Sequence, residues 1–254
     1  MSANKPLPYL PWLEPGDAFP PVRNAWGEAD PAPGLVAAGG DLSVAALVRA
    51  YSQGIFPWFS AGQPILWWSP EPRTVLRADA FKLHRSLRKT LSRLLLEDRL
   101  EVRFDFDFKR VIEACARTPR KGQAGTWILP DMVAAYTSLH GAGQAHSIET
   151  WIDGELVGGL YAVNVGRMVF GESMFSHHRD ASKLALAGLV AFVRAHQLPM
   201  IDCQQNTAHM ATLGSETLPR AEFCERVQGL SVQPMPIWNF DPLYWKFILP
   251  DNGF

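Results

Sequence analysis

Residues 145–176, AHSIETWIDGELVGGLYAVNVGRMVFGESMFS, decide the fold. Three runs rich in Val, Ile, Leu, Tyr and Phe are interrupted by the turn residues Asp153-Gly154 and by the turn NVGR at 164–167. Such runs are typical of β-strands, and short connections that contain Gly are typical of hairpins. The stretch therefore predicts an antiparallel meander of three strands.

Helices are predicted on both sides of the meander. Upstream, amphipathic periodicity predicts helices over residues 80–96, over 107–117 and over LPDMVAAYTSLHGAG at 129–143. Downstream, ASKLALAGLVAFVRAHQ at 181–197 predicts a strongly apolar helix, and PMIDCQQ at 199–205 predicts a buried strand. Helices, then strands, then one helix and one strand indicate the α+β class.

The N-terminal part differs from the rest in composition. Its Pro-rich start predicts an extended chain, which a helix from Val44 to Ser52 is expected to follow. IFPWFS at 55–60 and ILWWSPEPRTVL at 65–76 then predict two short strands. We expect a small N-terminal α/β domain over residues 1–78 and a larger domain over 79–254.

Composition bounds the class of protein. Of the 254 residues, 47% are hydrophobic and 19% are charged, which is enough apolar sequence for a sizeable core. The net charge of −1 gives no global attraction to nucleic acid, so any such contact must come from a local basic patch. The three cysteines lack metal-site spacing, and no apolar run approaches the ~18 residues of a membrane span. We therefore expect a cytoplasmic protein without a metal.

Two groups of polar residues lie in apolar strands. Glu172 is a carboxylate in a strand where an unpaired charge is costly. It is interpreted either as a functional group or as a structural partner of a nearby Arg such as Arg167. Asp202 and Gln204 are two positions apart, so a regular strand would place both side chains on one face. The pair of Asp202 and Gln204 predicts either a polar relay or a hydrogen-bonded pair at a sheet edge.

The predicted helix at 80–96 carries a basic face. Its cations are expected to stay in solvent, opposite an apolar stripe, and they are interpreted either as a simple solvated face or as a patch that binds phosphates. The residues concerned are Arg85, Arg88, Lys89 and Arg93. Packing could extend this face with Lys109, Arg110, Arg117, Arg120 and Lys121.

The order of meander, helix and strand also resembles the GNAT acyltransferases. That superfamily holds the pyrophosphate of coenzyme A on a glycine-rich loop at the start of the helix. The corresponding turn here, SHHRDASKLAL at 176–186, has no glycine. If the domain is GNAT-like, as this resemblance implies, we expect its acyl donor to be something other than a coenzyme A ester and the domain to need no cofactor.

Several long motifs, in the same order, resemble the leucyl/phenylalanyl-tRNA–protein transferase family. The resemblance runs from about Phe19 to Phe223. The motifs are GLVAAGGDLS, AYSQGIFPWFS, PILWWSPEPRTVL, GTWI, AYTSLHGAGQAHSIETW, ELVGGLYAVNVG, FGESMFS, DASKLAL and IDCQQNTAHMATLG.

The resemblance implies an enzyme of bacterial cytosol, a leucyltransferase of the acyltransferase class. Such an enzyme moves Leu or Phe, with Met as a further candidate, from aminoacyl-tRNA to the α-amino group of a protein that begins with Arg or Lys. The added residue marks that protein for N-end rule degradation. The resemblance also implies binding of the 3′ aminoacyl-adenosine end and phosphates of the tRNA, with the basic helix face as the tRNA-binding patch. A monomer is expected.

Site residues follow from the same resemblance. The catalytic set implied is Asp202, Gln204 and Glu172, with Gln204 accepting a hydrogen bond from the attacking amine and Asp202 orienting Gln204. The substrate-binding residues implied are Trp58, Trp127 and Tyr136 around the adenosine end, with Leu160, Val169, Met174, Leu189 and Val193 as an apolar cup for the amino-acid side chain.

Two features depart from the family pattern. Aliphatic residues stand at cup positions where other members have aromatic residues or Met, which leaves the preference between Leu and Phe open. Asp180 stands where Asn is expected. The alternatives from other classes are an acyl-CoA N-acetyltransferase and a non-catalytic module that binds RNA or peptide. The missing glycine loop argues against the first, and a binding module would not need the Asp202–Gln204 pair.

Overall fold

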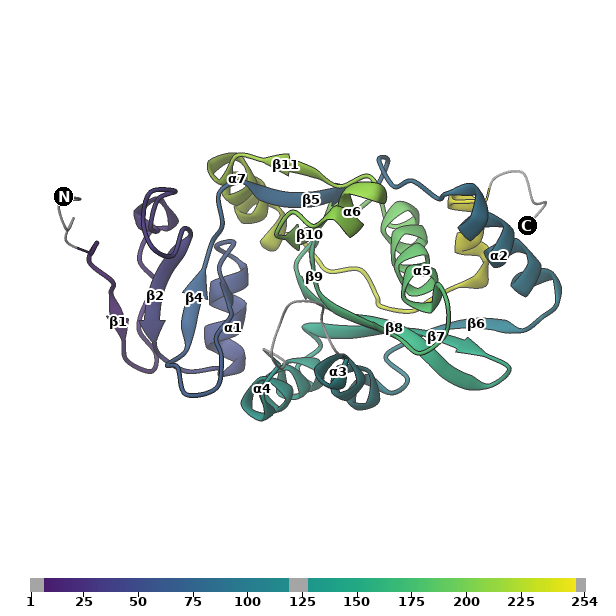
Figure 1. The fold of residues 1–254 in the computed structure, drawn as a ribbon, viewed down its shortest axis with the longest axis horizontal. Coiled ribbons are helices and arrows are strands. Elements are labelled where there is room, and N and C mark those ends of the chain that lie inside the picture. Colours follow the sequence, from purple (N-terminus) through teal and green to yellow (C-terminus); the bar gives the residue numbers. More distant parts are fainter. Residues whose placement is uncertain (1–6, 119–127, 250–254) are drawn as a thin grey trace, which may run out of the picture.

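The computed structural model describes residues 7–118 and 128–249, which form two sheets and the helices around them (Figure 1). The smaller sheet, at the N-terminal end, has the strand order β1-β2-β4-β3. Its strands are β1 (Trp12–Leu13), β2 (Leu35–Gly39), β3 (Phe56–Pro57) and β4 (Leu66–Trp68). Helix α1 (Val44–Tyr51) connects β2 to β3, and the Ser43 hydroxyl caps it by accepting a hydrogen bond from the Ala46 N–H at 3.3 Å.

The larger sheet has seven strands in the order β11-β5-β10-β9-β8-β7-β6. The predicted meander is confirmed, because β7, β8 and β9 pair in sequence as antiparallel neighbours. Strand β10 then pairs in parallel with β9 and antiparallel with β5, which places β5 between two strands from much later in the chain. The bounds are β5 (Arg73–Arg77), β6 (Leu100–Phe104), β7 (Ala145–Ile152), β8 (Glu155–Val165), β9 (Met168–Ser176), β10 (Met200–Gln204) and β11 (Glu216–Leu218).

Helices cover both faces of this sheet, and the α+β class is confirmed. Figure 1 shows α5 on one side of β7 to β9 and the pair α3 and α4 on the other. Helix α5 is buried nearly all round because α2 and the 3-10 helix η2 pack on the side away from the sheet. The bounds are α2 (Arg85–Leu96), α3 (Phe108–Arg117), α4 (Pro130–Gly141), α5 (Ala181–Ala195), α6 (Ala208–Thr212), α7 (Arg220–Ser231), η1 (Val22–Asn24) and η2 (Pro242–Phe247).

Two predicted elements differ from the structure. The helix predicted over 80–96 begins only at Arg85, because the Lys82 N–H donates to the Leu213 carbonyl at 2.9 Å and the segment before α2 follows that distant loop. The strand predicted over 65–76 is two strands, β4 and β5, in different sheets. The change of sheet falls between Trp68 and Arg73, and the division into domains at residue 78 stays a prediction.

The two sheets share a hydrophobic cluster. Trp67 of the smaller sheet, Tyr51 of α1 and Phe170 of β9 belong to the same cluster of buried side chains. A second cluster lies on the other face of the larger sheet, beneath α5. Within residues 7–118 and 128–249, no helix combines the length and the apolar character needed to cross a membrane.

Candidate active site

A cavity of about 320 Å³ lies where the two sheets meet. Its lining comes from β3 and the residue after it, from β8 and β9, from α5, and from β10 with the loop and helix that follow. Most of this lining is apolar, and it also includes two carboxylates and two side-chain amides. The residues are Phe56, Pro57, Trp58, Leu160, Tyr161, Gly171, Glu172, Ser173, Met174, Leu186, Leu189, Ile201, Asp202, Cys203, Gln204, Gln205, Thr207, His209 and Met210.

A β-bulge in strand β9 sets the position of Glu172. Tyr161 of β8 pairs with Ser173, and the next residue, Ala162, pairs with Gly171. Glu172 is therefore the extra residue on β9 and pairs with no residue of β8. Bulges of this kind interrupt the alternation of side chains and redirect one of them. Because of the bulge, the Glu172 side chain leaves the regular alternation of β9 and lines the cavity.

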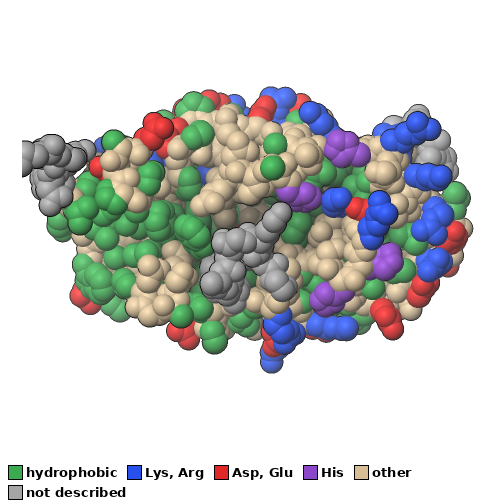
Figure 2. Space-filling view, in the orientation of Figure 1, with side chains coloured by type: hydrophobic (Ala, Val, Ile, Leu, Met, Phe, Trp, Pro, Cys, Tyr) green, Lys and Arg blue, Asp and Glu red, His purple; other side chains and the backbone are tan. Residues whose placement is uncertain are grey.

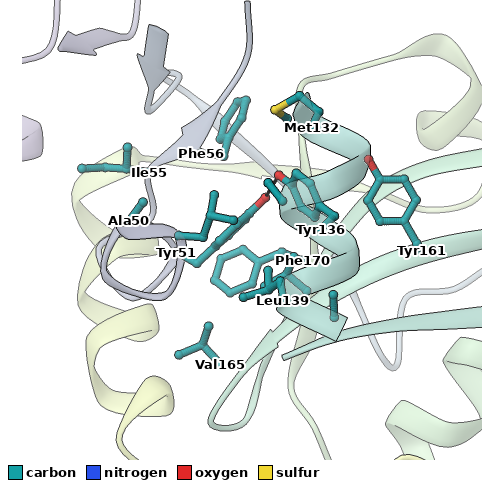
Figure 3. Packing of buried hydrophobic residues seen from close by; sticks show 14 of the residues in the cluster. Ala50, Tyr51, Ile55, Phe56, Met132, Tyr136, Leu139, Tyr161, Val165 and Phe170 are labelled. Atoms are coloured by element: carbon teal, nitrogen blue, oxygen red, sulfur yellow. Dashed lines mark hydrogen bonds between the residues drawn. The ribbon is translucent and has the colours of Figure 1, made fainter. Parts of the chain in front are cut away.

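Three neutral donors surround the Glu172 carboxylate. The Tyr51 hydroxyl donates to Oε1 at 2.7 Å, and the Tyr136 hydroxyl donates to Oε2 at 3.3 Å. The Gln204 side-chain Nε2 donates to Oε1 at 3.0 Å. Figure 3 shows the hydroxyls of Tyr51, from α1, and Tyr136, from α4, pointing toward one another at hydrogen-bond distance. Each hydroxyl has one hydrogen, so a tyrosine that donates to the other does not donate to Glu172 at the same time. The site thus brings together α1, α4, β9 and β10.

The surroundings of Glu172 favour its neutral form. Its pKa is raised from 4.5 to about 7, chiefly because burial penalises the charge, with a further contribution from the negative charge of Asp202. Hydrogen bonds from the three donors oppose this rise. Burial also raises the pKa of Tyr51 and of Tyr136 well above 10.0, so both hydroxyls keep their protons and act as donors.

The alternative interpretation of Glu172 as a partner of Arg167 is wrong. The Arg167 guanidinium instead donates through Nη2 to the backbone carbonyls of His196 and Gln197, both at 2.9 Å. Those carbonyls lie just past the end of α5, where helices leave their last C=O groups without helical partners. Arg167 therefore fixes the end of α5, and Glu172 depends on neutral partners.

Asp202 is fully buried and paired with Arg73. Arg73 Nε donates to Oδ1 at 2.8 Å and Nη2 donates to Oδ2 at 2.6 Å. Oδ1 also accepts the backbone N–H of Gln204 at 3.0 Å. The regular alternation that predicted Asp202 and Gln204 side by side is interrupted, because the register shifts between them and Gln204 has a φ of 61°. The described contact between these residues runs through the Gln204 backbone.

Comparison with known proteins places the chain in a family. Residues 75–228 match the family model described as leucyl/phenylalanyl-tRNA protein transferase. Residues 40–71 match the model of the N-terminal domain of the same transferase. The chain belongs to this family. Most of the cavity lining, from Leu160 to Met210, lies within the first match.

Curated relatives agree with this transferase family over nearly the whole chain. The relatives are named leucyl/phenylalanyl-tRNA–protein transferase. The one from Polaromonas sp. strain JS666 is 61% identical to this chain, and the match covers 94% of each chain. The relative from Paraburkholderia phytofirmans is 58% identical over 91% of this chain and 95% of its own. That from Leptothrix cholodnii is 56% identical over 96% of both. Among solved structures, L-PGS from Bacillus licheniformis is 8% identical, covering 84% of this chain and 70% of its own, with a TM-score of 0.35.

Several of the substrate-binding residues expected for a transferase of this family lie together. Trp58, Leu160, Met174 and Leu189 line the cavity, and Tyr136 contacts Glu172. Val169 and Val193 are fully buried in the cluster beneath α5 and are not among the lining residues. Trp127 lies outside the described residues.

Sequence reasoning missed other members of the site. Tyr51 and Arg73 contact the polar groups, while Leu186, Ile201, Cys203, His209 and Met210 join the lining. Tyr51 has the pattern of an ordinary core residue of an amphipathic helix, and Arg73 that of a charge at a strand end. Their partners, Glu172 for Tyr51 and Asp202 for Arg73, are distant in the sequence and close only in the folded structure.

The basic face of α2 is exposed at the end of the molecule away from the N-terminus. Figure 2 shows Lys and Arg side chains gathered at that end. Arg85, Arg88, Lys89 and Arg93 all belong to α2, and Arg93 pairs with Glu97 at 3.1 Å. Lys109, Arg110 and Arg117 lie on α3, across the sheet from α5 and α2, so they do not extend this face (Figure 1). Arg120 and Lys121 lie outside the described residues.

Proposed function

We propose that this protein is an aminoacyltransferase that moves Leu or Phe from aminoacyl-tRNA to the α-amino group of proteins with N-terminal Arg or Lys. The cavity carries this proposal. It joins apolar walls, such as Leu160, Met174 and Leu189, to a polar side made by Glu172 and Gln204. Relatives at 54–61% identity are named for the leucyl/phenylalanyl-tRNA–protein transfer, which supports the same substrates here.

The reaction is the aminolysis of an ester. The acceptor nitrogen attacks the aminoacyl carbonyl carbon, the ester C–O bond breaks, and the ribose 3′-oxygen leaves with a proton. An α-amino group has a pKa of about 7.7–8.0, so a useful fraction is neutral near neutral pH and no strong base is needed. The enzyme's main contribution is to hold amine and ester in attack geometry.

Gln204 would meet the attacking amine. Its Nε2 is held by Glu172 at 3.0 Å, which leaves the amide oxygen as the acceptor for an amine N–H. Glu172 itself would hold an ammonium group at the polar side of the pocket through charge-assisted hydrogen bonds. Trp58 and the apolar walls would receive the adenosine end and the Leu or Phe side chain.

The proposed function also implies a domain organisation, a tRNA-binding surface and a cellular location. We assign the residues after about 78 to a GNAT-like catalytic domain without a coenzyme A loop, and residues 1–78 to a domain that completes the pocket. The exposed cations of α2 would contact tRNA phosphates. The enzyme would act as a cytoplasmic monomer, and its products would enter the N-end rule pathway.

Direct transfer tests the proposed function. The protein is incubated with Leu-tRNA and a peptide that begins with Arg, and the peptide is expected to gain the mass of one leucyl residue. A peptide with a blocked N-terminus is the control and should gain nothing. Acetylation of the peptide from labelled acetyl-CoA, or binding of both substrates without a product, would contradict the proposal.

A further inference from the structure

Arg73 is a fully buried cation at the start of β5. Its guanidinium meets the Asp202 carboxylate with two parallel hydrogen bonds, and Nη1 donates to the Gly54 carbonyl at 3.1 Å. A buried charge is tolerated only when it is paired and hydrogen-bonded, and a two-pronged arginine–carboxylate contact also fixes the orientation of both groups. The pair therefore sets the direction of the Asp202 carboxylate.

Two aromatic rings hold the guanidinium from other elements. Its carbon lies 4.9 Å from the centre of the Phe56 ring and 4.6 Å from that of Phe223. Phe56 belongs to β3 and lines the cavity, Phe223 belongs to α7, and Gly54 follows α1. A single side chain thus connects the N-terminal sheet, β10 and α7 directly behind the cavity.

The Asp202 carboxylate in turn holds the backbone of Gln204. Oδ1 accepts the Gln204 N–H at 3.0 Å, and Gln204 lies in the left-handed region with a φ of 61°. A residue with a Cβ rarely adopts this conformation unless its surroundings impose it. The consequence of this geometry is that the Gln204 amide meets Glu172 at the cavity.

Both oxygens of Asp202 are already engaged. Oδ1 accepts from Arg73 and from Gln204, and Oδ2 accepts from Arg73 at 2.6 Å, with no exposed surface on the residue. An acceptor amine in the cavity would meet an Asp202 carboxylate that is already paired with the adjacent guanidinium. Although Asp202 belongs to the cavity lining, its carboxylate has no exposed surface and already accepts three hydrogen bonds, so it serves as an anchor for Gln204.

We propose that Arg73 is a positioning residue of the transfer reaction, which acts by fixing Asp202 and thereby holding Gln204 in the conformation that presents its amide to the cavity. This inference rests on the proposed function. It assigns Asp202 a structural part in the site, in place of the direct part that a relay would require. It also makes the charge of the pair dispensable, provided that both charges are removed together.

A double-mutant cycle tests this inference. Arg73→Gln leaves a buried carboxylate without its cation, and Asp202→Asn leaves a buried guanidinium without its anion, so both single variants are expected to be impaired. The double variant leaves no buried charge, and the amide oxygen introduced by Asp202→Asn would still accept the Gln204 N–H. We expect each single change to lower kcat ~100-fold or more with the KM for Leu-tRNA changed less than ~3-fold, and the double variant to regain at least ~10-fold over either.

Arg77→Gln is the matched control, because Arg77 is the exposed arginine at the other end of β5 and pairs with Asp79 at 3.2 Å. It should transfer Leu at the wild-type rate. Arg73→Lys keeps the charge but not the two-pronged contact, and it is expected to fold and to lose ~10-fold in kcat. Thermal unfolding of every variant shows which of them are folded.

The outcomes separate the possibilities. A folded double variant as inactive as Asp202→Asn, or a wild-type kcat for Arg73→Lys, would overturn the positioning role. The first of these results would show that the Asp202 charge acts on the amine directly. If wild-type protein transfers no Leu at all, the proposed function fails and the inference falls with it.

Discussion

Glu172 is a half-buried carboxylate whose described partners are all neutral. Tyr51, Tyr136 and Gln204 donate to it from three different elements, and burial raises its pKa to about 7. A cation that entered the cavity would favour the ionised form and bind to it. The residue is thus prepared to receive an ammonium group, which agrees with an amine or aminoacyl substrate.

Substitution of Glu172 by Gln should change how stability depends on pH. The folded-state pKa of about 7 lies above the ordinary value of 4.5, so the folded protein binds more protons than the unfolded chain between these two values. The free energy of unfolding therefore falls as pH rises through this window and levels off above it. Glu172→Gln should lack this fall and gain up to about 3 kcal/mol relative to wild type between pH ~5 and ~8.

Urea unfolding at several pH values measures this difference. A gap between the two proteins that stays constant with pH would contradict the assignment. In the wild type, the rate of leucyl transfer should rise near pH 7 as Glu172 ionises, and the variant should lack this rise. It should keep only the rise in rate caused by deprotonation of the acceptor amine, whose pKa is about 7.7–8.0. The rate of leucyl transfer as a function of pH shows whether one of the two steps disappears.

Single site residues could be predicted from the sequence only where a polar residue stands in an otherwise apolar strand. Glu172 stands out because a carboxylate is rare in an apolar strand, and Asp202 and Gln204 stand out as a polar pair two positions apart in another apolar strand. The family resemblance then implied their catalytic roles. Tyr51 and Arg73 carry no such local signal. Tyr51 is 121 positions from Glu172, and Arg73 is 129 positions from Asp202, so only the tertiary fold reveals these contacts.

At the scale of elements, α5 and β8 approach closely at Gly158. A Cβ placed on Gly158 would lie 2.5 Å from the Cβ of Ala181 and 2.8 Å from its carbonyl carbon, at the first turn of α5. Backbone cannot move aside as a flexible side chain does. The glycine is therefore what allows α5 to lie on the meander.

Gly158→Ala should destabilise the protein by ~1–3 kcal/mol, because the added methyl group forces α5 away from the sheet. Urea unfolding measures the change. Gly141→Ala is the matched control, since a Cβ there meets nothing within 4 Å and alanine favours the helix α4. Equal stability of the two variants would show that α5 does not need this close approach.

The basic face of α2 yields a prediction about tRNA. Reversal of Arg85, Arg88 and Lys89 to Glu should raise the apparent KM for Leu-tRNA and reduce its dependence on salt, because fewer phosphate counterions are released on binding. Lys109→Glu with Arg110→Glu on α3 is the control, since these exposed residues lie across the sheet (Figure 1). Unchanged tRNA binding at low salt after the α2 reversal would exclude the patch.

Elements were predicted well where their signal is local. The meander, α1, α3 and the helix after the meander follow from turn residues and periodicity over a few positions. The start of α2 and the split between β4 and β5 were missed because long-range pairing decides them. Residues before α2 bond to the loop after α6, and β5 pairs with β10 and β11.

For the whole molecule, the shared cluster of buried side chains predicts a single unfolding transition. Side chains from the small sheet, such as Trp67, pack in one cluster with Phe170 of the large sheet, and Tyr51 of α1 bonds to Tyr136 of α4. Neither part can open without exposing the other. Far-UV circular dichroism and tryptophan fluorescence should give coincident urea transitions, whereas two separate midpoints would show independent domains.

The position of β5 between β10 and β11, two strands that follow it much later in the chain, has a consequence for synthesis on the ribosome. Arg73 emerges 129 residues before Asp202, and at about 5–20 residues per second this delay is on the order of ten seconds. Both edges of β5 lack their final partners during that time, and unpaired strand edges promote aggregation. The apolar Val75 and Leu76 are flanked by Arg73 and Arg77, charges of the kind that discourage association between nascent chains. Arg73 would then protect the growing chain before it supports the finished site.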